Sequence, residues 1–171
     1  DHLGQYLVKL SSKDLSVKDS ATLSMLLHSI GDMERISDHA VNIAEGAEEM
    51  KQKNMSFSAE AEKEIGTFSD AVREILRLSL ESFIAEDRKE AVLVEPLEEV
   101  VDDLRDELKK RHVNRLREGK CTIELGFVLS DLTTNFERVA DHCSNIAACL
   151  IQTAEHDFEM HNYIHKLAKG E

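Results

Sequence analysis

A stretch of eleven residues occurs twice in this chain of 171 residues. Residues 34–44 read Glu-Arg-Ile-Ser-Asp-His-Ala-Val-Asn-Ile-Ala, and residues 137–147 read Glu-Arg-Val-Ala-Asp-His-Cys-Ser-Asn-Ile-Ala. Glu, Arg, Asp, His, Asn, Ile and Ala therefore recur in the same register. A repeat period of about one hundred residues predicts two copies of one structural unit.

Both copies lie within long helical patterns, and the rest of the chain is of the same kind. Helix-forming residues are abundant, there is a single proline and no tryptophan, and no long stretch alternates with period two. We therefore predict an all-α fold. The expected helices cover residues 1–12, 17–53, 58–85, 88–118 and 122–154, with a short polar tail helix over 157–169.

Local signals set several of these boundaries. Ser58 is expected to cap the third helix, because its hydroxyl can accept a hydrogen bond from a free backbone N–H of the first turn. Pro96 should kink the fourth helix or restart it near Val94. Gly119 is well placed as a C-terminal cap, because glycine readily takes the left-handed conformation found there.

Superposing the two copies predicts the domain organisation. Residues 56–155 hold a complete unit of three helices that ends with the repeated motif. Residues 1–55 hold only the end of the second helix and the motif helix of a first unit, and residues 156–171 form a polar tail. We therefore expect the sequence to be cut from a longer parent protein.

Composition excludes several functional classes. A formal net charge of -13 argues against nucleic acid as a partner, because phosphate binding needs clustered Lys and Arg. Three cysteines without a paired zinc spacing suggest a reducing compartment, and no apolar run is long enough to insert into a membrane. No phosphate-binding loop or nucleophile motif is present, so an enzyme is not expected.

Carboxylates separated by four residues stand above one another on a helix, and here such pairs lie away from the apolar face. Acidic pairs on a helix are usually only solvated, but stacked like charges are mildly destabilising, and two pairs recur in the same register. Ligation by oxygen alone favours iron(III), manganese, magnesium or calcium. The candidate metal ligands are Glu34, Asp38, Glu98, Asp102, Glu137 and Asp141.

The repeated motif resembles the signature of the PhoU family of phosphate-uptake regulators. The resemblance implies a tandem of two three-helix bundles related by a pseudo-twofold axis, with multinuclear iron or zinc clusters held at the surface by Glu/Asp-x-x-x-Asp motifs. Glu34 with Asp38 and Glu137 with Asp141 match that motif. On the helix before the second copy, residues 98–102 resemble the companion motif of the family, and residues 99–103 are an alternative register.

The second motif region looks most like the PhoU-like domain that follows the membrane part of bacterial sodium/phosphate cotransporter-like proteins. This resemblance implies a cytoplasmic, metal-binding regulatory domain at the inner face of the cell membrane. Its partner would be a membrane phosphate transporter, in the same chain or in another, and a homodimer is a further expectation.

Two alternatives remain open at this point. One is a metal-free helical scaffold whose acidic stripes contact a basic partner. The other is a ferritin-like metal-storage bundle, although its Glu-x-x-His pattern does not occur. His39 and His142 are expected to form interhelical hydrogen bonds more readily than to bind metal. Near the C-terminus, His161 and His165 are a further but weaker candidate pair for a transition metal.

Overall fold

The computed structural model describes the backbone of residues 2–169 and the side chains of residues 2–153. All the secondary structure in this part of the chain is helical, which confirms the predicted fold class. The helices are α1 (His2–Ser11), α2 (Val17–Gln52), α3 (Ala59–Ala85), α4 (Arg88–Ala91), α5 (Val94–Arg117) and α6 (Ile123–Lys169).

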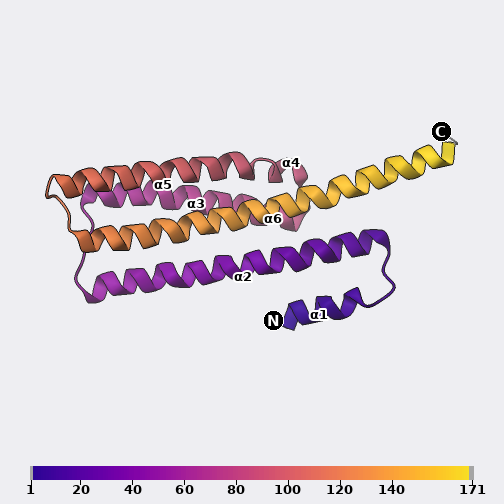
Figure 1. Cartoon of the computed structure of the whole chain (residues 1–171), viewed down its shortest axis with the longest axis horizontal. Coiled ribbons are helices and arrows are strands. Elements are labelled where there is room, and N and C mark those ends of the chain that lie inside the picture. The colour runs from indigo at the N-terminus through magenta and orange to yellow at the C-terminus, as the bar shows by residue number, and fades with distance from the viewer. Residues whose placement is uncertain (1, 170–171) are drawn as a thin grey trace.

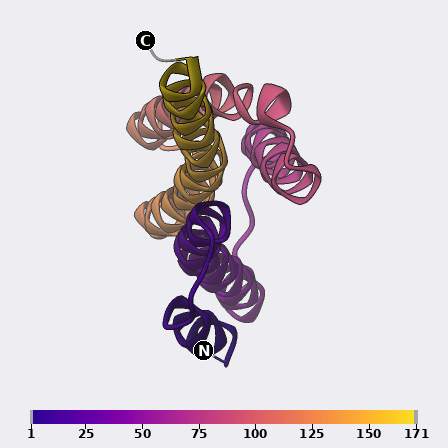
Figure 2. The same cartoon turned by 90° about the vertical axis from the view of Figure 1, so that its right-hand side faces the viewer.

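Helix α6 occupies the centre of an elongated bundle (Figure 1). It packs against α2 on one side and against α3, α4 and α5 on the other, while α1 packs against α2. Viewed along the long axis, α1, α2 and α6 follow one another in a row, and α3 and α5 lie beyond them (Figure 2). The two helices that carry the repeated motif are therefore direct neighbours.

The predicted boundary signals act as expected. Ser58 has extended backbone angles and accepts a hydrogen bond from the backbone N–H of Ala61, at 3.3 Å. Gly119 follows the C-cap of α5 and has a φ of +69°, which most other residues would adopt only with strain. The fourth segment is split into α4 and α5, and Pro96 falls in the first turn of α5, where its missing N–H costs nothing.

The prediction of a separate tail helix is wrong. Helix α6 continues without a break to Lys169. The physical reason is that neither glycine nor proline occurs between residues 155 and 169, so no residue there ends the helix. The side chains of His161 and His165 lie outside the described residues.

The hydrophobic core lies among α3, α5 and α6. Its fully buried members include Phe68, Ile75, Val101 and Ile146. Cys143 takes the repeat position of Ala40 on the apolar face of its helix, which predicts a core residue. It is fully buried, and burial raises the pKa of its thiol to about 12. This thiol is therefore a packing group and not a nucleophile or a metal ligand.

The apolar period of α2 predicts a long inward face that includes Ala40 and Ala47, but this face is only partly buried. Ala40 and Ala47 are exposed, whereas Cys143 and Leu150, which take the same repeat positions on α6, are buried. The difference follows from the arrangement of the bundle, because α6 is covered from both sides and α2 is covered elsewhere only by the short α1. Within α2, the buried residues are Leu23, Met25 and Ser29.

Candidate functional site

Four of the six predicted ligands come together where α5 meets α6, and Glu137 of α6 is one of them, because it shares Arg105 with Asp102. Glu98 and Asp102 lie on α5, and Asp141 lies on α6. Partial burial raises the pKa of Glu98, and the negative charges of Asp102 and Asp141 raise it further. The structure thus places the companion motif of α5 beside the repeated motif of α6, as the carboxylate hypothesis requires.

Two arginines provide positive charge within this cluster. Nη1 of Arg138 donates to Oδ2 of Asp141 on its own helix, at 3.2 Å, and Arg105 reaches the other carboxylates. Nη1 of Arg105 lies 3.2 Å from Oδ1 of Asp102, and the same atom forms an ion pair with Glu137. The N–H groups of Arg105 are poorly aligned with this oxygen, so Oδ1 of Asp102 is buried without a hydrogen bond. A buried carboxylate oxygen in this state has coordination capacity left, which a cation would use.

Glu95 belongs to the same cluster and was missed by the sequence analysis. Its negative charge adds to the rise in the pKa of Glu98, and it accepts a hydrogen bond from the hydroxyl of Ser144 on α6. The signal was available, because Glu95 stands one helical turn before Glu98 on the same face of α5. Ser144 lies within the second copy of the motif.

Within the described residues, Glu34 and Asp38 of the first motif are not joined to another carboxylate pair. Asp38 is exposed and pairs with Arg35 on its own helix, at 3.2 Å. Glu34 lines a shallow hollow between α2 and α1. The residues of α1 include no Asp or Glu, so the helix beside Glu34 brings no second carboxylate to it.

The cluster between α5 and α6 fits a hard cation by the chemistry of its donors, since they are all carboxylate oxygens. Its side chains are not arranged as a finished ligand set. Within residues 2–153, no three His, Cys, Asp or Glu side chains form a group that could hold a metal ion. Arg105 pairs with Asp102 and Glu137, and Arg138 pairs with Asp141, so a metal would have to displace these guanidinium groups.

The histidines of the two motif copies meet between α2 and α6. Nδ1 of His39 lies 2.9 Å from Oδ1 of Asn135, and Nδ1 of His142 lies 2.8 Å from Oδ1 of Asp32. Their rings stack with centroids 5.7 Å apart. Each histidine thus binds the opposite helix, in agreement with the expected interhelical role.

The motif asparagines complete this polar seam. Nδ2 of Asn42 donates to the same Asn135 oxygen at 3.1 Å, and Nδ2 of Asn145 donates to the same Asp32 oxygen at 3.2 Å. Asp32 and Asn135 occupy the same repeat position, so the contacts are related by an approximate twofold axis. The seam explains why His and Asn recur in the motif although they are not predicted ligands.

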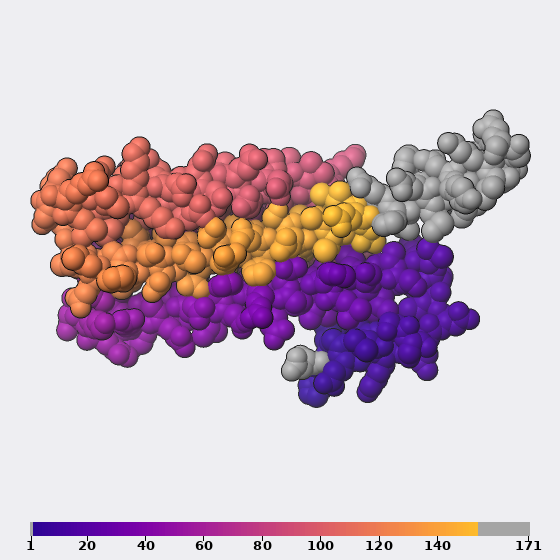
Figure 3. All heavy atoms as spheres, in the orientation of Figure 1, coloured from indigo at the N-terminus to yellow at the C-terminus, as the bar shows by residue number. Residues whose placement is uncertain are grey.

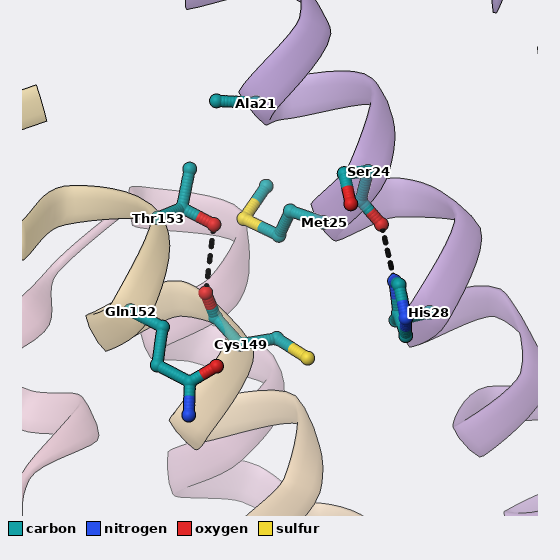
Figure 4. Close-up of a pocket in the computed structure, with 7 residues that line it drawn as sticks. All are labelled: Ala21, Ser24, Met25, His28, Cys149, Gln152 and Thr153. Carbon is teal, nitrogen blue, oxygen red and sulfur yellow. Dashed lines mark hydrogen bonds between the residues drawn. The ribbon is translucent and has the colours of Figure 1, made fainter. Parts of the chain in front are cut away.

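A pocket beyond this seam lies between the start of α2 and α6 (Figure 4). His28 and Cys149 face it from the two helices, and Nδ1 of His28 is held by the backbone oxygen of Ser24 at 2.8 Å. Burial raises the pKa of the Cys149 thiol. The thiol therefore stays protonated at neutral pH and is a poor nucleophile.

None of the helices in the described part of the chain is both long and apolar enough to cross a membrane. The space-filling view shows α2, α5 and α6 lying against one another along the length of the bundle (Figure 3).

Comparisons with known proteins agree with this arrangement. The family model described as the PhoU domain matches residues 2–47 and 65–150. The chain is similar to the phosphate-specific transport system accessory protein PhoU homolog 1 of Thermotoga maritima, with 29% identity over 115 residues, or 67% of this chain and 49% of that protein. It is also similar to the PhoU homolog of Deinococcus radiodurans, with 26% identity over 133 residues, or 76% of this chain and 60% of that protein.

The fold is similar to that of a solved structure. The crystal structure of PhoU from Pseudomonas aeruginosa superposes with a TM-score of 0.83 at 21% identity, covering 91% of this chain and 74% of that one. This likeness establishes a PhoU-like fold. The chain spans between 49% and 60% of the length of the two curated relatives that it matches.

Proposed function

Because this chain belongs to the PhoU family, we propose that it is a regulatory domain that controls phosphate uptake. The observation that carries the proposal is the repeated motif, which the family model covers in both copies. The two relatives are accessory proteins of a phosphate-specific transport system. This family membership confirms the prediction that the chain is not an enzyme.

The proposed mechanism uses the carboxylates where α5 meets α6. Glu98, Asp102, Glu137 and Asp141 would hold the metal, with iron or zinc favoured by the family resemblance and manganese as another candidate. The bound metal would supply positive charge in place of the two arginines there. The helices would then be joined by a charged site whose occupancy can change, which is what a regulatory element requires.

Glu34 and Asp38 are proposed as half of a second site. On α2 they are exposed and have no facing carboxylates within the described residues. They would bind metal only together with acidic residues from another segment or another copy of the chain. The domain boundaries at residues 55 and 155 remain part of this proposal, with α1 and α2 as the incomplete unit.

The partner that we propose is a membrane phosphate transporter at the inner face of the cell membrane. The finer form of the proposal is that the chain is the cytoplasmic domain of a sodium/phosphate cotransporter-like protein. The names of the two relatives favour a separate accessory protein that acts on a transporter encoded in another chain. Both forms predict that removing the domain changes phosphate uptake in phosphate-rich medium.

A ferritin-like storage bundle is the weaker alternative, because it requires carboxylates in the interior. The buried polar residues in the described part of the chain are Ser29, Ser79, Ser82, His112, Arg115 and Thr133, with no Asp or Glu among them. A metal-free scaffold remains the alternative that experiment must exclude.

Metal content tests the proposal directly. We expect the purified chain to contain iron, zinc or manganese by mass spectrometry, and the Glu98→Ala/Asp102→Ala variant to lose most of it. The matched control is Asp70→Ala/Glu74→Ala, which removes an exposed pair with the same spacing from α3. Equal metal content in the two variants would remove this site from consideration. A chain that contains no metal and takes up none on reconstitution would favour the scaffold.

A further inference from the structure

An apolar groove lies at the end of the bundle where α5 meets α6, at the left of Figure 1. Its walls include Val113 of α5 and Ile123 and Phe127 of α6. Ile123 is 71% exposed and Phe127 is 69% exposed, and the two project from the same face of α6 because they are four residues apart. Large apolar side chains exposed around one groove indicate an interaction surface.

The floor of the groove contains a buried histidine with an unused hydrogen-bonding atom. His112 is only 5% exposed, and its Nε2 has no partner among the described residues. Nε2 lies against Gly126, where an added Cβ would approach it to 2.9 Å. A buried polar atom without a partner costs free energy, and a ligand with a polar group could satisfy it.

Basic residues gather near the groove in a protein that is otherwise strongly acidic, and one of them lines it. Against a net charge of -13 for the chain, residues 109–120 contain six Lys or Arg and a single Glu. Lys109 lines the groove, and Arg117 lies one turn beyond Val113 on α5. Within the described residues neither cation forms an ion pair, so both charges remain available to a partner.

We propose that this groove between α5 and α6 docks an acidic amphipathic helix of a protein partner. Two antiparallel helices with an apolar hollow between them form the kind of surface that receives the apolar face of a third helix. Carboxylates flanking that face would meet Lys109 and Arg117, which supplies charge complementarity. The site is a hollow between two helices, and this shape suits a helix better than the broad surface of an anionic membrane.

The proposal is independent of the metal site, because Phe127 and Lys109 belong to the other end of α5 and α6 from the carboxylates Glu98 and Asp141. A failure of metal binding would leave the groove unchanged. Failure of helix docking would equally leave the metal measurement intact.

The test uses a fluorescein-labelled synthetic helix of about 18 residues, long enough for several turns, with leucine along one face and glutamate on both flanks. A second peptide has lysine in place of every glutamate. Fluorescence anisotropy with the full chain is expected to show binding of the acidic peptide and at least about tenfold weaker binding of the basic one. Phe127→Ser should weaken binding of the acidic peptide about tenfold, and Lys109→Glu should weaken it several-fold.

Two control variants match these changes at the opposite end of the bundle. Ile84→Ser removes an apolar side chain that is 80% exposed on α3, and Lys89→Glu reverses an exposed charge on α4. Both should bind the peptide like the original chain. Circular dichroism melts check that every variant is folded, which is expected because all the altered side chains lie at the surface.

Three results would overturn the proposal. The first is equal binding of the acidic and basic peptides, or no binding of either. The second is binding to vesicles of anionic lipid that Phe127→Ser abolishes, which would make the groove a membrane contact. The third is a concentration-dependent dimer in sedimentation that Phe127→Ser dissociates, which would make the occupant a second copy of this chain.

Discussion

Replacing Glu64 by glutamine should destabilise the protein strongly, because it leaves the charge of Arg115 buried without a counter-charge. The two side chains are 11% and 9% exposed, and Nη1 of Arg115 lies 2.9 Å from Oε2 of Glu64. Removing one partner of a buried ion pair costs about 3–5 kcal/mol. Neither Oε2 of Glu64 nor Nη2 of Arg115 forms a hydrogen bond, so we expect the lower end, about 3 kcal/mol.

Urea unfolding followed by circular dichroism measures this loss directly, and thermal melts give a second readout. At about 2–4 °C per kcal/mol for a chain of this size, the melting temperature should fall by about 6–12 °C. The control is Arg111→Ala, which removes the other arginine near Glu64. Its side chain is 51% exposed, so this change should cost less than about 1 kcal/mol.

The double replacement Glu64→Leu/Arg115→Met separates the two contributions. Since the desolvation cost of both charges disappears together, this variant should be about as stable as the original chain or more stable. A Glu64→Gln variant within about 1 kcal/mol of the original would refute the reasoning, because it would mean that Arg115 finds solvent or another partner.

Three further predictions concern the glycine and histidines described above. Gly126→Ala should destabilise the chain by about 1–3 kcal/mol in urea unfolding, because the new methyl group would lie 2.9 Å from Nε2 of His112. The control is Gly46→Ala, which should be neutral or stabilising because the space around Gly46 is open. Burial and a neighbouring arginine hold the pKa of His112 below its ordinary 6.5. As the pH falls, the imidazole of His112 is therefore protonated in the unfolded chain before it is protonated in the folded chain. The free energy of unfolding should fall as the pH drops below about 6.5, and His112→Gln should lessen that fall in thermal melts across this range. Asp32→Ala should cost about 1–3 kcal/mol, because it leaves Nδ1 of His142 without its acceptor, and a variant as stable as the original would show that water replaces the carboxylate.

Much of the fold could be predicted from local chemistry. Each helix boundary signal acts locally. Ser58 accepts a hydrogen bond from the first turn, Pro96 lacks an N–H donor, and Gly119 allows a positive φ. None of these effects depends on a distant residue. The core face of α3 follows from its apolar period. The prediction of a separate tail helix failed because the polar composition of this segment was taken to end the preceding helix, although no residue in 155–169 stops a helix.

The candidate site was predictable only in part. The sequence placed Glu98 and Asp141 on their helices, but which helices meet depends on the packing of the whole bundle. Arg105 was not foreseen as a cation within the carboxylates, because it is contributed by the turn after Asp102 and reaches α6 only through tertiary contact. The exposure of Ala40 was missed for the same reason, since periodicity identifies an apolar face but not whether a neighbour covers it.

The central place of α6 also has a consequence for folding during synthesis. The helix that contacts α2, α3, α4 and α5 is the last of them to leave the ribosome. Until it emerges, α3 and α5 can pair with each other, but the face of α2 that α6 covers stays open. We expect the nascent chain to expose that face of α2 throughout that interval, which makes it a substrate for chaperones, and to gain protection from proteolysis there in one late step.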